Sequence, residues 1–210
     1  MGSLLIVFQI LVLLFSVVIH EVAHGAMALS LGDQTAKRLG RLTLNPVVHL
    51  DLVGSILLPI FLYIISMGGF VFGYAKPVPY NPLNLRDRRY GPAKVAIAGP
   101  LANIIVALIF GLALRFLPAG LTLSIIPQLF ALIVFMNLLL AIFNLIPIPP
   151  LDGHWLLLTF LPDSLHHFKQ AYLQYGMILF IFALFFIFPT ILPAVTGLFR
   201  LIVGAPIDFF

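Results

Sequence analysis

Five long apolar runs constrain this chain more than any other feature of its sequence. They cover residues 4–31, 53–72, 93–117, 125–146 and 175–203, and short segments that hold most of the charged residues separate them. A transmembrane helix needs about 20 consecutive apolar residues, which is close to the length of each run. The hydrophobic fraction is 62% and the charged fraction 9%, whereas soluble domains are about 45–50% apolar and about 25% charged. We therefore predict an all-α polytopic membrane protein.

The whole chain, residues 1–210, is predicted to form one membrane-embedded domain. It shows no internal repeat and no polar linker long enough to separate a soluble domain, and it has no cysteine for a disulfide or a thiolate metal site. The net charge is +4, but the basic residues gather between the apolar runs. That distribution is typical of membrane topology, so we expect contact with the lipid bilayer and no nucleic-acid partner.

The first apolar run carries three titratable side chains in the sequence His20-Glu21-Val22-Ala23-His24, and Glu21 is the only glutamate. A charge in hydrocarbon costs at least ~2.5–3.5 kcal/mol, so ionisable residues there indicate a functional site. Residues four apart share one helical face, which lets the two imidazoles bind one zinc ion. Glu21 then acts as general base on a metal-bound water. The alternative is two core histidines and a protonated glutamate, which leaves three polar groups unpaired in the membrane.

A catalytic zinc ion has three protein ligands and an open position for water, so one more ligand is required. Asp152 is the best candidate, because it follows a run that ends in three prolines. Unwound backbone at membrane depth is tolerated where it lines a cavity or is covered by protein. The alternative is an ordinary Asp-Gly turn. We predict one Zn²⁺ per chain, bound by His20, His24 and Asp152.

These motifs together resemble the site-2 protease family of intramembrane zinc metalloproteases, in a compact form without a PDZ or CBS domain. The resemblance covers most of the chain and rests on five segments: His20 to His24, Gly40-Arg41-Leu42-Thr43-Leu44-Asn45-Pro46, Ala98-Gly99-Pro100 with Asn103, Asn144-Leu145-Ile146-Pro147, and Leu151-Asp152-Gly153. It implies that His20, His24 and Asp152 ligate zinc and that Glu21 is the base. It also implies that Asn144 helps to hold the substrate or the oxyanion.

The chain departs from the family pattern directly after Gly153. His154-Trp155 follows there, where the family usually has a further glycine and often an arginine. A histidine two residues from a ligand could approach the metal, but we expect His154 to face the aqueous boundary.

We therefore predict an enzyme that hydrolyses peptide bonds in or next to transmembrane segments of single-span membrane proteins. A helical substrate must unwind, and an exposed strand edge could hold it extended by β-augmentation. The candidate edges are Arg41-Leu42-Thr43-Leu44, which alternates like a short strand, and the proline-rich residues 75–80. We assign Arg41, Leu42, Thr43 and Leu44 to substrate binding, together with Asn144.

The alternative is a protein without enzymatic activity, either a membrane zinc transporter or a regulatory scaffold. A transporter needs further polar residues along its path, and the third and fifth apolar runs offer almost none.

The predicted ligands also constrain the topology. The histidines lie towards the end of the first run and Asp152 lies just past the fourth. The two runs must therefore cross in the same direction, and one of the runs between them does not span. If residues 53–72 are re-entrant, all basic residues except Arg115 and Arg200 fall on one side, as the positive-inside rule favours. We expect four to five membrane segments, with 53–72 packed beside the site. The active site faces the cytoplasmic side of a prokaryotic plasma membrane.

Overall fold

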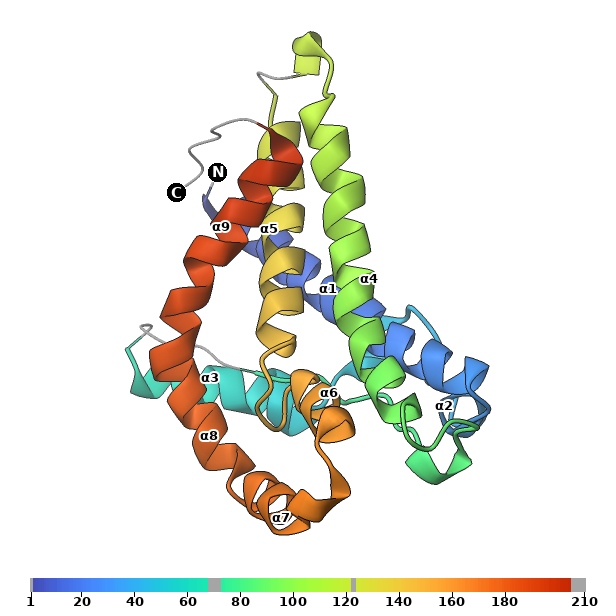
Figure 1. Ribbon diagram of the computed structural model, residues 1–210. Coiled ribbons are helices and arrows are strands. Elements are labelled where there is room, and N and C mark those ends of the chain that lie inside the picture. Colours follow the sequence, from blue (N-terminus) through green and yellow to red (C-terminus); the bar gives the residue numbers. More distant parts are fainter. Residues whose placement is uncertain (1, 68–72, 122–123, 205–210) are drawn as a thin grey trace.

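A computed structural model describes residues 2–67, 73–121 and 124–204 of the chain (Figure 1). Within these residues the ordered elements are almost all helical. The α-helices are α1 (Gly2–Ser30), α2 (Thr35–Arg38), α3 (Leu58–Ile65), α4 (Gly91–Arg115), α5 (Ile126–Asn144), α6 (Gly153–Phe160), α7 (His166–Gln174), α8 (Gly176–Phe182) and α9 (Phe188–Val203). The short 3₁₀ or π segments are η1 (Pro46–His49), η2 (Leu52–Leu57), η3 (Pro82–Asn84), η4 (Ala119–Leu121), η5 (Asp163–Leu165) and η6 (Ala183–Ile187).

Four helices in the described part of the chain are long and apolar enough to cross a membrane. They span Leu5–Ser30, Gly91–Arg115, Ile126–Asn144 and Gly176–Val203. The last of these joins α8, the π-helical η6 and α9 into one continuous helix. They correspond to the first, third, fourth and fifth apolar runs. The prediction of an all-α integral membrane protein is therefore confirmed.

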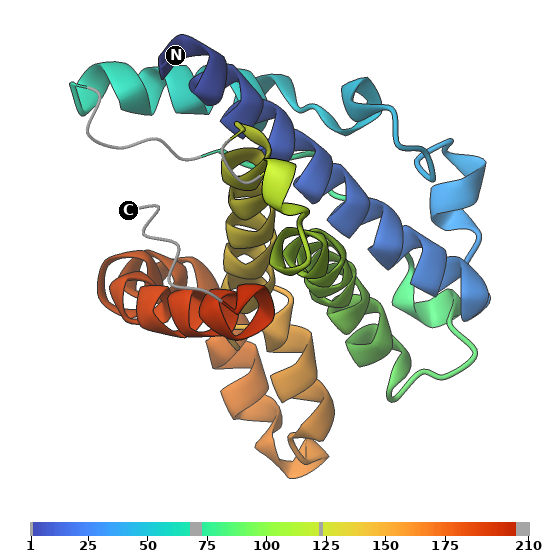
Figure 2. The ribbon, with the colours of Figure 1, turned by 90° about the horizontal axis from the view of Figure 1, so that it is seen from above.

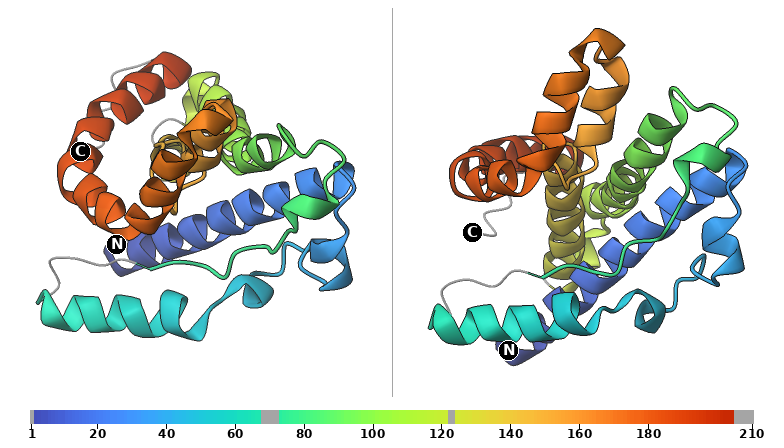
Figure 3. Two further views of the ribbon diagram at one scale, coloured as in Figure 1. Left: turned by 60° about the horizontal axis from the view of Figure 1, so that its bottom comes forward. Right: turned by 90° about the horizontal axis from the view of Figure 1, so that it is seen from below.

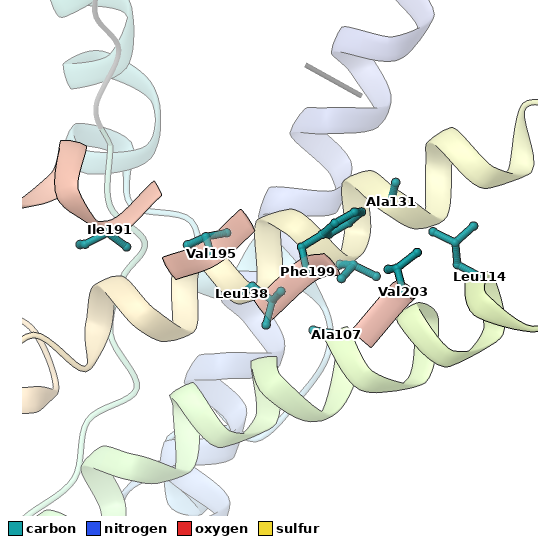
Figure 4. Close-up of a cluster of buried hydrophobic side chains, with 9 residues drawn as sticks. Ala107, Leu114, Ala131, Leu138, Ile191, Val195, Phe199 and Val203 are labelled. Atoms are coloured by element: carbon teal, nitrogen blue, oxygen red, sulfur yellow. The ribbon is translucent and has the colours of Figure 1, made fainter. Parts of the chain in front are cut away.

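Helix α4 packs against both α1 and α5, and α9 packs on α5 and α4. Seen from above, α1 runs obliquely past the two central helices (Figure 2). The apolar core between α4, α5 and α9 is drawn in Figure 4. It consists of Ala107, Leu114, Ala131, Val134, Leu138, Ile191, Val195, Phe199 and Val203. Gly111 permits the close approach of α9, because a Cβ there would lie 2.4 Å from Ile202 Cγ2. Small residues at such contacts are typical of membrane helices.

The second apolar run forms a shorter helix, Leu52–Ile65, made of η2 and α3. Its 14 residues would be about 21 Å long, which is less than the ~30 Å hydrocarbon core. In both views of Figure 3, α3 lies on the opposite side of α1 from α8 and α9. No residue of α3 is buried, and the expectation that residues 53–72 pack beside the active site stays a prediction. Residues 68–72 of the predicted re-entrant segment lie outside the described residues.

Residues 75–80 are extended, as the alternating prolines predict, but they form no β-strand. Arg41 to Leu44 form no strand either, and Thr43 lies in a bend. The predicted short β elements are therefore absent from the described residues. Pro77 and Pro79 have no amide hydrogen to give to a neighbouring strand. Instead the buried Arg41 side chain donates from Nη2 to the carbonyl oxygens of Lys76 at 2.8 Å and Pro77 at 3.3 Å.

The buried side chain of Asp33 ties the end of α1 to the segment that leads into α4. Its Oδ2 accepts from Asn81 N at 2.7 Å, and its Oδ1 accepts from Asn84 Nδ2 at 2.9 Å and Thr35 Oγ1 at 2.6 Å. Burial opposes ionisation of this carboxyl, but these hydrogen bonds outweigh it and hold the pKa of Asp33 below its ordinary value. The clamp fixes where residues 75–80 lie along α1.

Candidate active site

The structure brings together the three residues that the sequence predicts as metal ligands. His20 Nε2 lies 3.0 Å from Asp152 Oδ2, and His24 Nε2 lies 3.2 Å from the same oxygen. The two imidazole nitrogens are 3.0 Å apart. Helix α1 places both histidines on one face, and Asp152 lies in the turn between α5 and α6. The result is a compact group of two nitrogens and one oxygen from distant parts of the sequence.

This group fits a zinc ion in its spacing and in its chemistry. Tetrahedral ligands at about 2.0–2.1 Å from zinc lie about 3.3 Å from one another, close to the 3.0–3.2 Å observed here. Asp152 Oδ2 is buried and has no hydrogen-bond partner among the described residues. The oxygen that faces both imidazoles is therefore left without a protein donor, as expected for a metal ligand.

Gly99 of α4 leaves room at the same point. A Cβ on Gly99 would lie 2.4 Å from His24 Nε2 and 2.7 Å from His20 Cε1. Any larger residue would push against both rings, so the glycine preserves the space in front of the donor atoms. This contact gives a physical reason for the glycine of the Ala98-Gly99-Pro100 motif.

Hydrogen bonds on the far side of each ring determine its tautomer. His24 Nδ1 lies 2.7 Å from the carbonyl oxygen of Val95. That oxygen can only accept, so His24 carries its proton on Nδ1. His20 Nδ1 lies 2.7 Å from Asn103 Oδ1, and the amide orientation is fixed because Asn103 Nδ2 donates to the carbonyl of Ser16 at 3.1 Å. Both Nε2 atoms therefore present lone pairs towards Asp152, as a metal requires.

A buried polar network extends from His20 through the centre of the membrane helices. Asn103 Nδ2 donates to Asn137 Oδ1 at 2.8 Å, and Asn137 Nδ2 donates to Ser16 Oγ at 2.9 Å. Both asparagines are fully buried, and together with Ser16 they connect α1, α4 and α5. Sequence reasoning missed Asn137 and Ser16. The available signal was a polar side chain in the middle of an apolar run, which indicates function or specific pairing.

Glu21 is held in place by the extended segment of residues 75–80. Its Oε2 accepts a hydrogen bond of 2.7 Å from the backbone N–H of Val78. The Val78 side chain packs on α1 at Gly25, where a Cβ would lie 2.7 Å from Val78 Cγ1. Figure 3 shows this part of the chain running along α1. The carboxylate is thus oriented by a backbone donor, while no described residue contacts Oε1 through a hydrogen bond.

The remaining predicted site residues have different surroundings. Asn144 is the last residue of α5, and its Nδ2 donates one hydrogen bond of 2.9 Å to Leu140 O. The second hydrogen on Nδ2 has no protein acceptor among the described residues. Arg41 is buried against the extended segment, so its guanidinium positions the chain. Leu42 packs on Gly25, and Leu44 is exposed.

The turn that delivers Asp152 is tightly packed. A Cβ on Gly153 would lie 2.2 Å from the carbonyl oxygen of Leu145, and Tyr172 Oη donates to Pro147 O at 2.5 Å. His154 is buried, and its Nδ1 donates to Leu151 O at 2.6 Å. The expectation that His154 faces the aqueous boundary is therefore wrong, because the ring folds back onto its own turn.

Comparison with known proteins agrees with this geometry. Residues 119–188 match the family model described as Peptidase family M50. The chain is 36% identical over 180 residues to "Putative zinc metalloprotease YwhC" of Bacillus subtilis, which covers 83% of this chain and 78% of that protein. It is 33% identical over 144 residues to "Putative zinc metalloprotease Rip2" of Mycolicibacterium smegmatis, which covers 67% of this chain and 52% of that protein. No solved structure matches the chain significantly.

Proposed function

This chain belongs to peptidase family M50, and on that premise we propose that His20, His24 and Asp152 bind its zinc ion and that Glu21 is its catalytic base. The protein is an intramembrane zinc metalloprotease of the site-2 protease type. The observation that carries the residue assignment is the triangle of two lone-pair nitrogens and one unpartnered carboxylate oxygen, with sides of 3.0–3.2 Å.

Zinc bound by these three side chains supplies Lewis-acid activation of a carbonyl and lowers the pKa of a water molecule. Glu21 would then accept a proton from the attacking water, most readily on Oε1, since Oε2 already accepts a hydrogen bond from Val78 N–H. The same carboxyl returns the proton to the leaving amine as general acid. The free hydrogen on Asn144 Nδ2 is available to the carbonyl oxygen as negative charge develops on it.

The substrates are proposed to be single-span membrane proteins, whose scissile segment unwinds before cleavage. Of the two candidate edges, Arg41 to Leu44 has more free amide donors, because in it only the Arg41 amide donates, to Ala36 O. The amide groups of Leu42, Thr43 and Leu44 donate no hydrogen bond within the described part of the chain. In residues 75–80, by contrast, Lys76 N donates to His49 O and Val78 N donates to Glu21. An extended substrate would therefore add to Leu42–Leu44.

The decisive experiment separates proteolysis from zinc binding. Glu21→Gln should abolish cleavage of a single-span substrate in proteoliposomes and leave one zinc ion bound per chain. Asp152→Ala should remove most of the zinc, because a catalytic site has only three protein ligands. Cleavage by Glu21→Gln at the wild-type rate would refute the base assignment, and full zinc occupancy in Asp152→Ala would refute the ligand assignment.

A further inference from the structure

A cleft of about 630 Å³ lies between the residues that lead into α4 and the segment formed by α6, η5 and α7. No residue of the proposed mechanism lines it. Its charged and aromatic lining includes Arg88, Arg89, Lys169, Asp163 and Trp155. Pro92, in the first turn of α4, also lines it, so the cleft lies at the end of a spanning helix. At that depth the hydrocarbon core of a bilayer gives way to the lipid headgroups.

The two arginines of the cleft have no acidic partner in the described part of the chain. The nearest acid in the sequence is Asp87, whose Oδ2 pairs with Lys94 Nζ at 2.7 Å. The other oxygen of Asp87 accepts from Tyr90 N at 2.8 Å. Arg88 and Arg89 are both exposed. Their positive charges are therefore available to an anion that enters the cleft.

The opposite wall adds a third cation. Lys169 Nζ lies 3.1 Å from Asp163 Oδ1, but the side chain of Asp163 is fully exposed. Exposed ion pairs are weak, so a ligand with a higher negative charge can compete with this carboxylate. Among the described residues that line the cleft, three cations thus face one carboxylate.

Aromatic side chains lie in the same cleft as the cations. Trp155 lines it, and so does Phe160 at the end of α6, which is 75% exposed. Tryptophan is enriched where a membrane meets water, because its amphipathic ring fits the headgroup level. A ligand that matches this lining carries negative charge and borders on hydrocarbon, which describes an anionic lipid better than a free anion.

We propose that this cleft binds the headgroup of an anionic phospholipid from the adjoining leaflet, with Arg88, Arg89 and Lys169 contacting its phosphate oxygens. Guanidinium groups pair well with phosphate, and basic pockets between membrane helices suit anionic headgroups. A choline headgroup would bring its own positive charge towards the three cations, so the cleft should select phosphatidylglycerol over phosphatidylcholine. The bound lipid would connect the segment before α4 to α6, the helix that begins beside Asp152.

Trp155 makes this binding measurable, because it is the only tryptophan in the chain. The full chain is reconstituted in phosphatidylcholine vesicles that contain increasing fractions of phosphatidylglycerol, and the tryptophan emission is recorded. We expect a saturable shift in the wild type. In Arg88→Gln/Arg89→Gln the phosphatidylglycerol fraction at half-saturation should rise about 30-fold, or about fivefold for each lost charge.

Lys37→Gln/Arg38→Gln is the matched control, since it removes two exposed charges of α2 that lie outside the cleft. Its titration should match the wild type. Absence of a saturable shift would overturn the proposal, and so would an equal loss in this control, which would reveal only general attraction to a charged surface. Inorganic phosphate or glycerol phosphate, added to vesicles of phosphatidylcholine alone, should leave the emission unchanged. The same shift with either compound would identify a soluble phosphate as the ligand instead.

Lys169→Gln tests the cleft from its other wall and does not depend on the double arginine variant keeping its fold, which circular dichroism checks. Its half-saturation point should rise about fivefold, and a value equal to that of the wild type would contradict the assignment. Native mass spectrometry of protein extracted from the mixed vesicles gives a second readout. The wild type should retain one phosphatidylglycerol molecule more than Arg88→Gln/Arg89→Gln, and equal retention would exclude the site.

Discussion

At the residue scale, the two imidazoles depend on groups that never touch the metal. Asn103 Oδ1 accepts a hydrogen bond from Nδ1–H of His20, and the carbonyl oxygen of Val95 accepts one from Nδ1–H of His24. Such partners fix the ring orientation and the tautomer, and their loss commonly weakens metal binding. The side-chain partner can be tested by substitution, whereas the backbone partner cannot.

Asn103→Ala should weaken zinc binding by about 10–100-fold, because His20 loses the acceptor that keeps its proton on Nδ1. Titration with a competing chelator measures the change. Asn137→Ala should have a smaller effect, since Asn137 contacts Asn103 and not the histidine. Equal zinc affinity in Asn103→Ala and the wild type would show that the network does not control the ligand.

Gly99→Ala should eliminate both zinc binding and cleavage, because the added methyl group would lie 2.4 Å from His24 Nε2. Gly197→Ala is the matched control, since it is also a glycine in a spanning helix and a Cβ there meets no atom within 4 Å. Metal analysis and the proteolysis assay should find Gly197→Ala normal. Zinc retention by Gly99→Ala would mean that α4 can shift away from the two histidines and accommodate the added methyl group.

The ligands His20, His24 and Asp152 could be predicted because their side chains have a recognisable type and spacing. The base Glu21 could be predicted for the same reason. Val78 and Val95 could not, since each contributes only a backbone group. Any residue would supply the carbonyl of Val95, and any residue except proline would supply the N–H of Val78.

At the scale of elements, the spanning helices were predictable because their length and apolar composition leave few alternatives. The short strands were not formed, because the prolines of residues 75–80 remove the donors that a ladder needs. The side chains of Arg41 and Asp33 hold this part of the chain instead. Sequence patterns indicate backbone periodicity well. They do not reveal that hydrogen bonds from single side chains hold a segment in place of the backbone hydrogen bonds of a sheet.

The Asp33 clamp should make the connection to α4 sensitive to acid. The pKa of Asp33 is lowered in the folded protein, so its contribution to stability is complete above the ordinary value and is lost as pH falls through the lower, folded value. Protease cleavage between residues 81 and 90, followed from neutral pH to pH 3 with an acid-tolerant protease, should rise at the acidic end. Asp33→Asn should be cleaved faster at neutral pH and show a weaker acid response. Identical acid profiles would exclude Asp33 as the cause.

At the scale of the whole molecule, the Asp33 clamp also bears on topology. Asn84 bonds Asp33 directly, so the connections before and after residues 52–72 lie at the same end of the bundle. This supports the proposal that the second apolar run enters and leaves on one side. The charge distribution supports the cytoplasmic side for that end and for the active site.

Single cysteines at Gln34 and Leu83 should therefore both react with a membrane-impermeant reagent added from the cytoplasmic side, and neither should react from outside. Leu83 is 71% exposed, which makes it accessible without removing a hydrogen bond of the clamp. A cysteine at Gly120, between α4 and α5, should show the opposite pattern. Labelling of the Gln34 and Leu83 variants from different sides would require residues 52–72 to cross.

The alternating prolines around Val78 also determine which amide can face the base. Val78 N–H bonds Glu21, with Pro77 before it and Pro79 after it. A slip of the segment by one residue in either direction would bring a proline opposite the carboxylate, and proline has no hydrogen to donate. Among alignments within one residue of the native one, only the native one gives Glu21 a backbone N–H donor. The two prolines therefore exclude a shift of the segment by one residue in either direction. Pro77 and Pro79 thereby preserve the alignment of the catalytic base.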